Sequence, residues 1–222
     1  GESTSMLQLT ELARDAELEQ RRKANDAKAL LDAAMAGLAI AAPEPCALRH
    51  LRIGVPTTVV QEQLDPPVAA AFGRAVQRLA SAGAAVEEFA FPELAEILAS
   101  YARATFSGVE AWAWHRARFQ HERERYDWRV AKRLISTADV SAADYVDLLK
   151  LRDRVMASAA ARTARFDVLA MPTVPILPPR IDLLEQDDAA FFRLQPMTVR
   201  NCQLFNFLNR PAISLPAHDP GD

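Results

Sequence analysis

Apolar residues recur at helical spacing along most of the chain, and a few short apolar runs bounded by prolines interrupt them. Between residues 7 and 38, a stretch of alternating charge leads into apolar positions that share one helix face. Pro43 and Pro45 follow and indicate a linker. We therefore predict a charged helical segment with a linker over residues 1–45, and a separate domain over residues 46–222.

A β–α–β pattern opens this second domain. The apolar runs at 51–55 and 85–91 predict two strands. Between them, Asp65 and Pro66 suit the N-cap and first position of a helix, and Gly83 suits the left-handed residue after it. Two strands joined through one helix are expected to be parallel neighbours with a right-handed crossover.

Helical spacing dominates the rest of the chain. Residues 93–165 are predicted to be mainly helical, with breaks near Tyr126 and Thr137 and with Ser141 as a helix cap. Three further elements are predicted: a strand over 166–171, a helix over 189–207 and a short strand over 212–215. The whole pattern predicts an α/β fold, with part of a mixed sheet flanked by helices.

Composition and charge exclude several classes of partner. The net charge of −3 gives no reason to expect nucleic acid or an anionic membrane surface. No apolar run reaches the roughly 18–20 residues that span a bilayer, and the first residues do not resemble a signal peptide. Cys46 and Cys202 form no paired or metal-binding motif, so we expect a cytoplasmic protein.

The residues that would hold a metal or a nucleotide are not arranged for either. The four histidines include no pair at i, i+4 and no HExxH motif. The seven glycines are scattered, and no GxGxxG or Walker sequence occurs. We therefore predict no metal site and no cofactor.

Two stretches carry side chains suited to binding a small ligand. In YDWRVAKR at 126–133, an arginine beside aromatic rings can stack and still offer its planar fork to a carboxyl or amide group. The alternative is a surface corner held by aromatic packing. In MPTVP at 171–175, Thr173 follows a strand, and ligands in open α/β sheets bind outside the carboxyl ends of strands. The alternative there is a rigid strand exit.

Seven sequence blocks occur in the order found in one enzyme family. They are LRIGVP at 51–56, GAAVEE at 83–88, EAWAWH at 110–115, YDWRVAKR at 126–133, ADY at 143–145, FDVLAMPTVP at 166–175, and FN at 205–206 followed by PAISLP at 211–216. Together these blocks resemble the amidase-signature family, which includes the A subunit of glutamyl-tRNA amidotransferases.

The resemblance implies an amidase-signature α/β fold and hydrolysis of a carboxamide by acyl transfer. Family members use a nucleophilic Ser, a second Ser on a cis peptide and a Lys, all within a Gly- and Ser-rich signature upstream of the matched blocks. None of the chain's four lysines stands in such a context, and no Gly-Ser-Ser-Gly run occurs. We therefore expect an incomplete domain with no catalytic residue of its own.

On this resemblance the chain supplies one wall of a pocket for a small-molecule amide, with Tyr126, Arg133 and Thr173 as substrate-binding candidates. Asn209 stands where the family has a glycine, and asparagine also adopts positive φ. The alternative is a truncated, non-enzymatic homologue that binds a ligand or assembles with other chains. Missing sheet neighbours would expose strand edges, which favours a homo-oligomer or a partner subunit.

Overall fold

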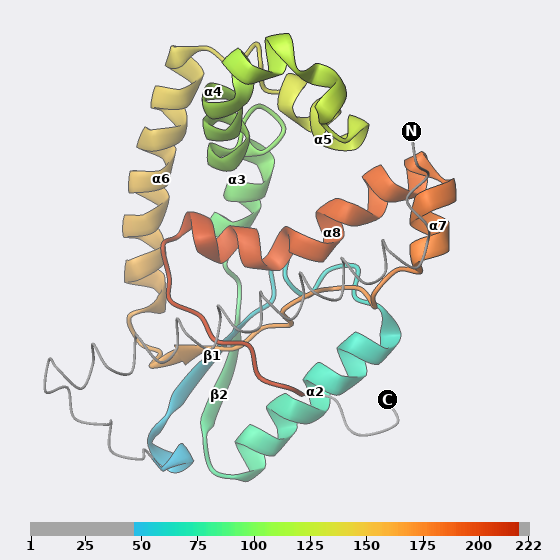
Figure 1. Ribbon diagram of the computed structural model, residues 1–222. Helices are drawn as coiled ribbons and strands as arrows, with labels where there is room; N and C mark the ends of the chain where they lie inside the picture. Colours follow the sequence, from blue (N-terminus) through green and yellow to red (C-terminus); the bar gives the residue numbers. More distant parts are fainter. Residues whose placement is uncertain (1–46, 218–222) are drawn as a thin grey trace, which may run out of the picture. The chain divides into compact units, whose positions relative to one another are not determined.

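A parallel three-stranded sheet organises the part of the chain that the computed structural model describes, residues 47–217 (Figure 1). The strand order is β2–β1–β3, so β1 (Arg52–Pro56) lies between β2 (Ala85–Phe89) and the two-residue β3 (Val168–Leu169). β1 pairs in parallel with both neighbours. The predicted α/β fold class is confirmed.

The chain separates into two compact units, Gly1–Pro45 and Cys46–Asp222, and every described residue belongs to the second. The charged helix predicted over residues 7–38 lies outside the described residues. Within residues 47–217, no helix combines the length and the apolar character that crossing a bilayer requires.

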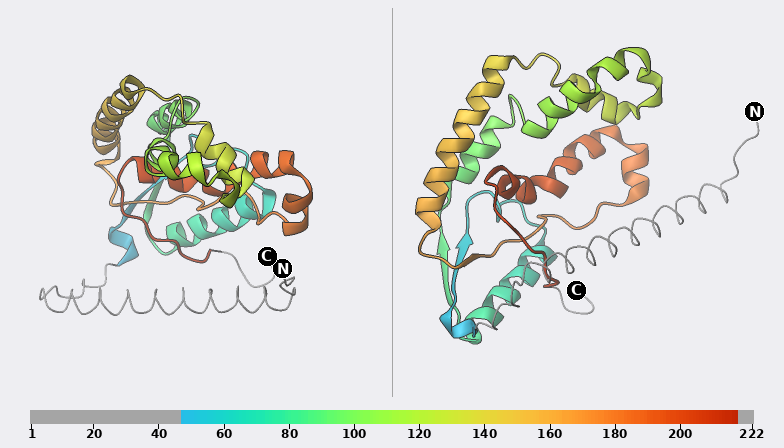
Figure 2. Two further views of the ribbon diagram at one scale, coloured as in Figure 1. Left: turned by 45° about the horizontal axis from the view of Figure 1, so that its top comes forward. Right: turned by 60° about the vertical axis from the view of Figure 1, so that its left-hand side comes forward.

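Helices are distributed unevenly around the sheet. α2 (Pro66–Ser81) runs alongside the strands, whereas the other large helices gather beyond the carboxyl ends of β1 and β2 (Figures 1 and 2). The remaining elements, in chain order, are η1 (Leu48–His50), α3 (Pro92–Ser100), α4 (Phe106–His121), η2 (Arg123–Arg125), α5 (Trp128–Ile135), α6 (Ala142–Thr163), α7 (Ile181–Gln186) and α8 (Asp188–Phe207). The helix breaks predicted near Tyr126 and Thr137 are confirmed.

Local signals set several helix ends as predicted. Gly83, at φ 99°, follows α2 in a conformation that side chains other than glycine rarely adopt. Ser141 and Asp144 form a capping box at the start of α6. Asn209, at φ 54°, turns the chain after α8.

Asp65 occupies the N-cap position of α2, but its side chain does not cap the helix. The next two residues are prolines and carry no N–H for it to accept. Instead, the Asp65 carboxylate accepts a hydrogen bond of 2.7 Å from the Leu177 backbone N–H, and the Asp65 N–H donates to the Pro175 carbonyl at 2.9 Å. Asp65 therefore joins the start of α2 to the segment that follows β3.

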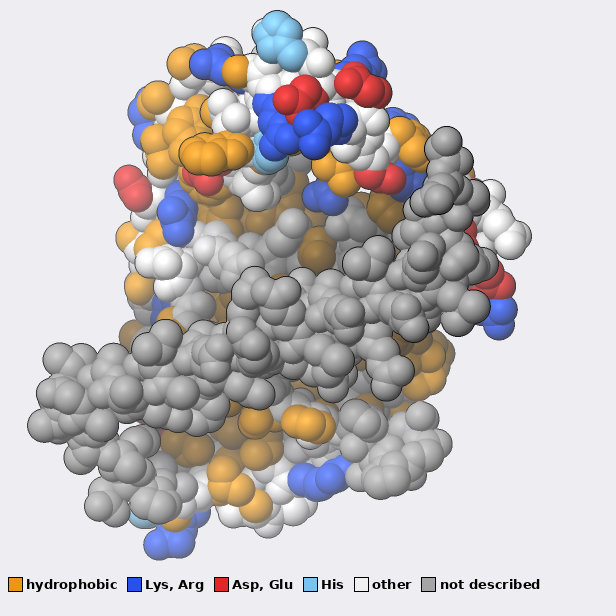
Figure 3. Space-filling model, in the orientation of Figure 1, with side chains coloured by type: hydrophobic (Ala, Val, Ile, Leu, Met, Phe, Trp, Pro, Cys, Tyr) orange, Lys and Arg blue, Asp and Glu red, His pale blue; other side chains and the backbone are white. Residues whose placement is uncertain are grey.

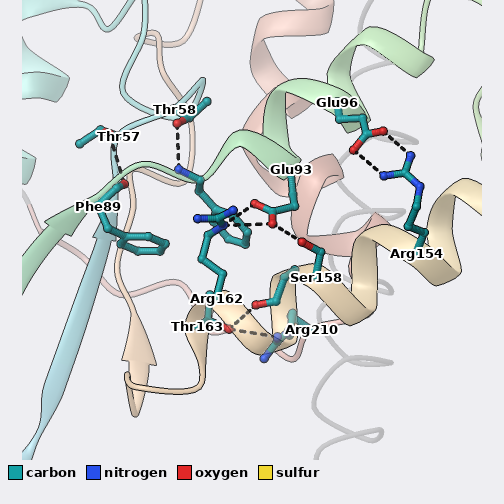
Figure 4. Close-up of polar contacts among 12 residues, drawn as sticks. Thr57, Thr58, Phe89, Glu93, Glu96, Arg154, Ser158, Arg162, Thr163 and Arg210 are labelled. Carbon is teal, nitrogen blue, oxygen red and sulfur yellow. Dashed lines mark hydrogen bonds and ion pairs between the residues drawn. The ribbon is translucent and has the colours of Figure 1, made fainter.

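The main core lies where α3, α6 and α8 meet the end of β2 and the loop after β1. Within it, the buried Glu93 carboxylate of α3 accepts hydrogen bonds from Ser158 and Arg162 of α6, at 2.5 and 2.7 Å (Figure 4). Burial raises the pKa of Glu93, but these hydrogen bonds outweigh it and the net pKa is lowered. The pair therefore stays ionised and holds α3 against α6.

The prediction of a strand over residues 212–215 is wrong. This segment is extended but forms no strand, and within residues 47–217 no backbone–backbone hydrogen bond joins residues 211–217 to another part of the chain. The side chains of Ile213 and Leu215 are 82% and 70% exposed. The strand-like sequence pattern is present, but a strand also needs a neighbour, and the described residues provide none.

Asn201 of α8 is completely buried and links the two loops at the carboxyl ends of β1 and β3. Its amide nitrogen donates to the Val60 carbonyl at 3.0 Å and to the Pro172 carbonyl at 2.8 Å. Its oxygen accepts from the Arg200 Nε at 3.1 Å. One side chain thus satisfies two loop carbonyls that are removed from water.

The opposite end of the β1–β3 pair is held by an ion pair. The Asp167 carboxylate accepts hydrogen bonds from the Arg52 backbone N–H at 2.8 Å and from the Arg52 Nη2 at 2.7 Å. These hydrogen bonds and the adjacent positive charge lower the pKa of Asp167 to about 2. Because β3 has only two residues, this contact supplements a short ladder.

Replacing Gly54 tests how closely β3 packs on β1. A Cβ on Gly54 would lie 2.6 Å from Phe166 and 2.8 Å from Leu169, whereas a Cβ on Gly73 of α2 meets nothing within 4 Å. We expect Gly54→Ala to destabilise the chain by about 1–3 kcal/mol, and the matched Gly73→Ala to stabilise it by about 0.5–1 kcal/mol. Urea unfolding of the 222-residue chain measures both; equal effects would contradict the packing described here.

Among the described residues, Asn201 is the only side chain that donates to the buried carbonyls of Val60 and Pro172, and Asn201→Ala removes this donor. We expect it to lower the free energy of unfolding by about 2–4 kcal/mol, because a buried acceptor left without a donor keeps the cost of its desolvation. The control is Asn206→Ala, the same change at an exposed position of the same helix. Urea midpoints that shift equally in the two variants would rule out the bridging role.

Asp167→Asn tests the acid dependence of stability. Because the folded-state pKa lies below its ordinary value of 3.8, the carboxylate stabilises the fold above that value and loses its effect as the pH falls through about 2. We expect Asp167→Asn to unfold at lower urea than the parent chain at neutral pH, with the gap narrowing on acidification. Asp147→Asn, exposed on α6, is the control. A gap that stays constant down to pH about 2 would exclude this linkage.

Candidate functional site

The loop between β1 and α2 has a strained backbone. It lies at the carboxyl ends of the strands, which is where open parallel sheets bind ligands. Val59, a β-branched residue, adopts φ 64°. The backbone N–H of Val59 donates to the Glu62 side chain at 2.8 Å, and the buried Arg200 donates to the Glu62 carbonyl at 2.7 Å. With the hydrogen bond from Asn201 to Val60, these contacts fix the loop against α8.

Thr173 lies at the same edge, in the segment after β3. Its hydroxyl is 3.1 Å from the Ser214 hydroxyl, and its carbonyl accepts from the Cys202 thiol at 3.5 Å. Thr173 itself is exposed. The sequence pointed to Thr173 because it follows a strand; the Ser214 hydroxyl beside it comes from a segment 41 residues away and could not be paired with it by spacing.

Tyr126 lies at a second place, the corner formed by α4, η2 and α5. Its hydroxyl is 3.0 Å from the His115 Nδ1, and its ring packs edge-on against Phe119. Phe119, Ala131 and Leu134 form a small core of their own beneath it. Both interpretations of this block therefore keep support: the aromatic rings do hold the corner together, and Tyr126 also borders a hollow.

This corner pocket has a volume of about 700 Å³. It is lined by both apolar and charged side chains: Arg123, Glu124, Tyr126, Trp128, Ala131, Lys132 and Ile135. A volume in the range of roughly 300–1,000 Å³ is typical of small-molecule sites.

Arg129 stacks on its neighbours as the sequence suggested, but its guanidinium N–H groups already donate to other residues of the chain. The guanidinium carbon lies 4.4 Å from the ring centre of Phe191 and 5.5 Å from that of Trp128. Its nitrogens donate to Asp188 at 2.7 Å and to the Leu184 carbonyl at 2.6 Å. Arg129 therefore holds α5 against α7 and α8 rather than offering donors to a ligand.

Arg133 is exposed on α5, one helical position beyond Lys132, and is not among the residues that line the corner pocket. Tyr126 and Arg133 thus share one corner, whereas Thr173 lies at the strand edge, and no described interaction joins Thr173 to either of them.

Lys132 and Arg123 line the pocket but were not predicted from the sequence as binding residues. Asn201 was not predicted either, although its place on an apolar helix face, four residues after Met197 and three before Leu204, was a usable signal.

Within residues 47–217, no three His, Cys, Asp or Glu side chains are grouped so that they could hold a metal ion. The described residues offer hydroxyls at the strand edge, and cations with aromatic rings at the corner.

Comparison with known proteins adds the family. The family model described as Amidase matches residues 10–222. The 2-amino-5-chloromuconic acid deaminase of Comamonas testosteroni is 36% identical over 189 residues, which cover 85% of this chain and 40% of that protein. The A subunit of glutamyl-tRNA(Gln) amidotransferase from Sulfurisphaera tokodaii is 27% identical, over 79% of this chain and 41% of its own length. This chain thus spans about 40% of the length of these relatives.

The fold agrees with solved structures. An allophanate hydrolase variant from Kluyveromyces lactis superposes with a TM-score of 0.58 at 20% identity, over 70% of this chain and 25% of that one. Because the family model matches nearly the whole sequence and the fold follows the same pattern, the chain belongs to the amidase family.

Proposed function

We propose that this chain is part of an amidase that hydrolyses a small-molecule carboxamide by acyl transfer through a Ser–cis-Ser–Lys triad. In this proposal the chain supplies a wall of the substrate pocket, and polypeptide outside these 222 residues supplies the triad. The main support is that the chain matches the amidase family model but spans only about 40% of the length of its relatives. The matched sequence blocks all belong downstream of the family's Gly- and Ser-rich signature.

The lysines within the described residues support this division. Lys132 lies exposed on α5, and Lys150 lies exposed on α6 beside Asp147. A lysine that relays a proton between two serines needs a low-dielectric site next to both hydroxyls. Neither position provides one.

Three side chains are proposed to contact the substrate. Thr173, with Ser214 at 3.1 Å, offers a hydroxyl that donates or accepts at the strand edge. Tyr126 presents its ring to the corner pocket, and the exposed Arg133 carries a planar set of donors suited to a carboxyl or amide oxygen.

The proposed substrate class and cellular location rest on the name of a relative and on the cysteine positions. The deaminase relative is named for an acid, and we propose a small organic amide that also carries an acid group as substrate. The two cysteines stand far apart in the sequence and outside any disulfide or metal motif, which favours a cytoplasmic location.

A second candidate is a non-enzymatic module that assembles with a partner subunit or with its own copies. It is favoured by the extended segment at 211–217, where Ile213 and Leu215 project with no neighbouring strand among the described residues. Open edges of this kind favour pairing with another chain. Native mass spectrometry separates the candidates: a monodisperse assembly of the isolated chain favours the module.

We expect the purified 222-residue chain to hydrolyse no amide, and amidase activity to arise only when the upstream part of an amidase domain is supplied with it. Ammonia release from a panel of aryl and aliphatic amides measures this, with a fluorophosphonate as the probe for an activated serine. The control is the same co-expression with the nucleophilic serine of the upstream part replaced by alanine. Fluorophosphonate-sensitive turnover by the chain alone would refute the proposal that the triad lies outside these 222 residues.

A further inference from the structure

Positive charge is concentrated at the α4–α5 corner although the chain as a whole is negative. Residues 116–133 hold seven basic and three acidic side chains, a net charge of +4, against −3 for the complete chain. Figure 3 shows Lys and Arg side chains gathered, with fewer acidic ones, over the end of the molecule formed by α4 and α5. A local excess of this size attracts anions.

Two of these cations border the corner pocket without an acidic partner. Within residues 47–217, neither Arg123 nor Lys132 forms an ion pair, and the Lys132 ammonium lies 4.2 Å from the Phe192 ring centre. Glu124 is the acidic residue of the lining, so the pocket keeps a charge of +1. Three neighbouring cations already have acidic partners: Arg118 and Arg125 share Glu122, and Arg129 pairs with Asp188.

The rest of the pocket lining is flat or apolar. Tyr126 and Trp128 contribute aromatic rings, and Ala131 and Ile135 contribute aliphatic surface. Trp128 packs edge-on against Phe192 at 5.8 Å, and about half of its surface stays exposed. Aromatic walls beside two unpaired cations suit a ligand that is planar at one end and anionic at the other.

We propose that this pocket binds a small planar carboxylic acid, with Lys132 and Arg123 on the carboxylate and Tyr126 and Trp128 against the flat apolar part. The assignment of such an acid as substrate rests on the amidase function proposed above. Binding to the pocket does not, because it needs no turnover and no upstream polypeptide.

The test is the binding of trans-cinnamate to the complete 222-residue chain by titration calorimetry, with the signal of the Trp128 indole N–H followed by NMR. Cinnamamide is the uncharged comparison, and 3-cyclohexylpropanoate is the saturated acid of similar size. We expect cinnamate to bind about tenfold more tightly than cinnamamide and at least about threefold more tightly than the saturated acid, and to shift the Trp128 signal.

Charge variants assign the contacts. Lys132→Gln and Arg123→Gln are each expected to weaken cinnamate binding by about three- to tenfold, and Glu124→Gln to strengthen it by about twofold. Lys150→Gln on α6 removes a lysine away from the pocket lining and is expected to leave the affinity unchanged. Because all four side chains are exposed, the variants are expected to fold, which circular dichroism verifies.

Equal affinity for cinnamate and cinnamamide would overturn the proposal, as would an unshifted Trp128 signal or an equal loss of affinity in Lys150→Gln. If cinnamate binds as expected but the co-expressed enzyme hydrolyses nothing, the pocket stands and the amidase assignment fails. If hydrolysis occurs but cinnamate does not bind, the amidase assignment stands and the pocket proposal fails.

Discussion

The Asn201 carboxamide holds together three parts of the chain that lie far apart in the sequence. It belongs to α8 and donates to Val60 in the loop after β1 and to Pro172 in the loop after β3. Because both carbonyls are closed off from water, a side chain with two N–H donors is needed there, and few residues other than asparagine or glutamine provide them. The strained Val59 and the exposed Thr173 are the chain neighbours of the two residues that this bridge joins.

Much of the fold could be predicted because its signals are local. Gly83, the pair Ser141 and Asp144, and Asn209 each act within a few residues of their own position, and the structure places all of them as expected. Asp65 shows the limit of such signals. Its local context indicated a helix cap, but Pro67 removes one of the two usual capping donors, and the carboxylate accepts from Leu177, 112 residues away.

The candidate site was less predictable for the same reason. Tyr126 was identified because aromatic and charged residues are adjacent in its block, but whether a cation there is paired depends on residues from other elements. Arg129 finds Asp188 at a separation of 59 residues, while Lys132, three positions along α5, meets only an aromatic ring among the described residues. Sequence spacing gives the inventory of charges at the corner, and tertiary contacts decide which of them remain available.

The extended segment at 211–217 has a thermodynamic consequence. If a polypeptide strand paired with this segment only in the folded chain, each such contact would add its free energy to that of folding. Apparent stability would then rise with the concentration of that strand by mass action, and the melting temperature of the chain would depend on what else is in solution. For a chain that spans about 40% of the length of its relatives, folding and assembly would then be measured by one and the same equilibrium.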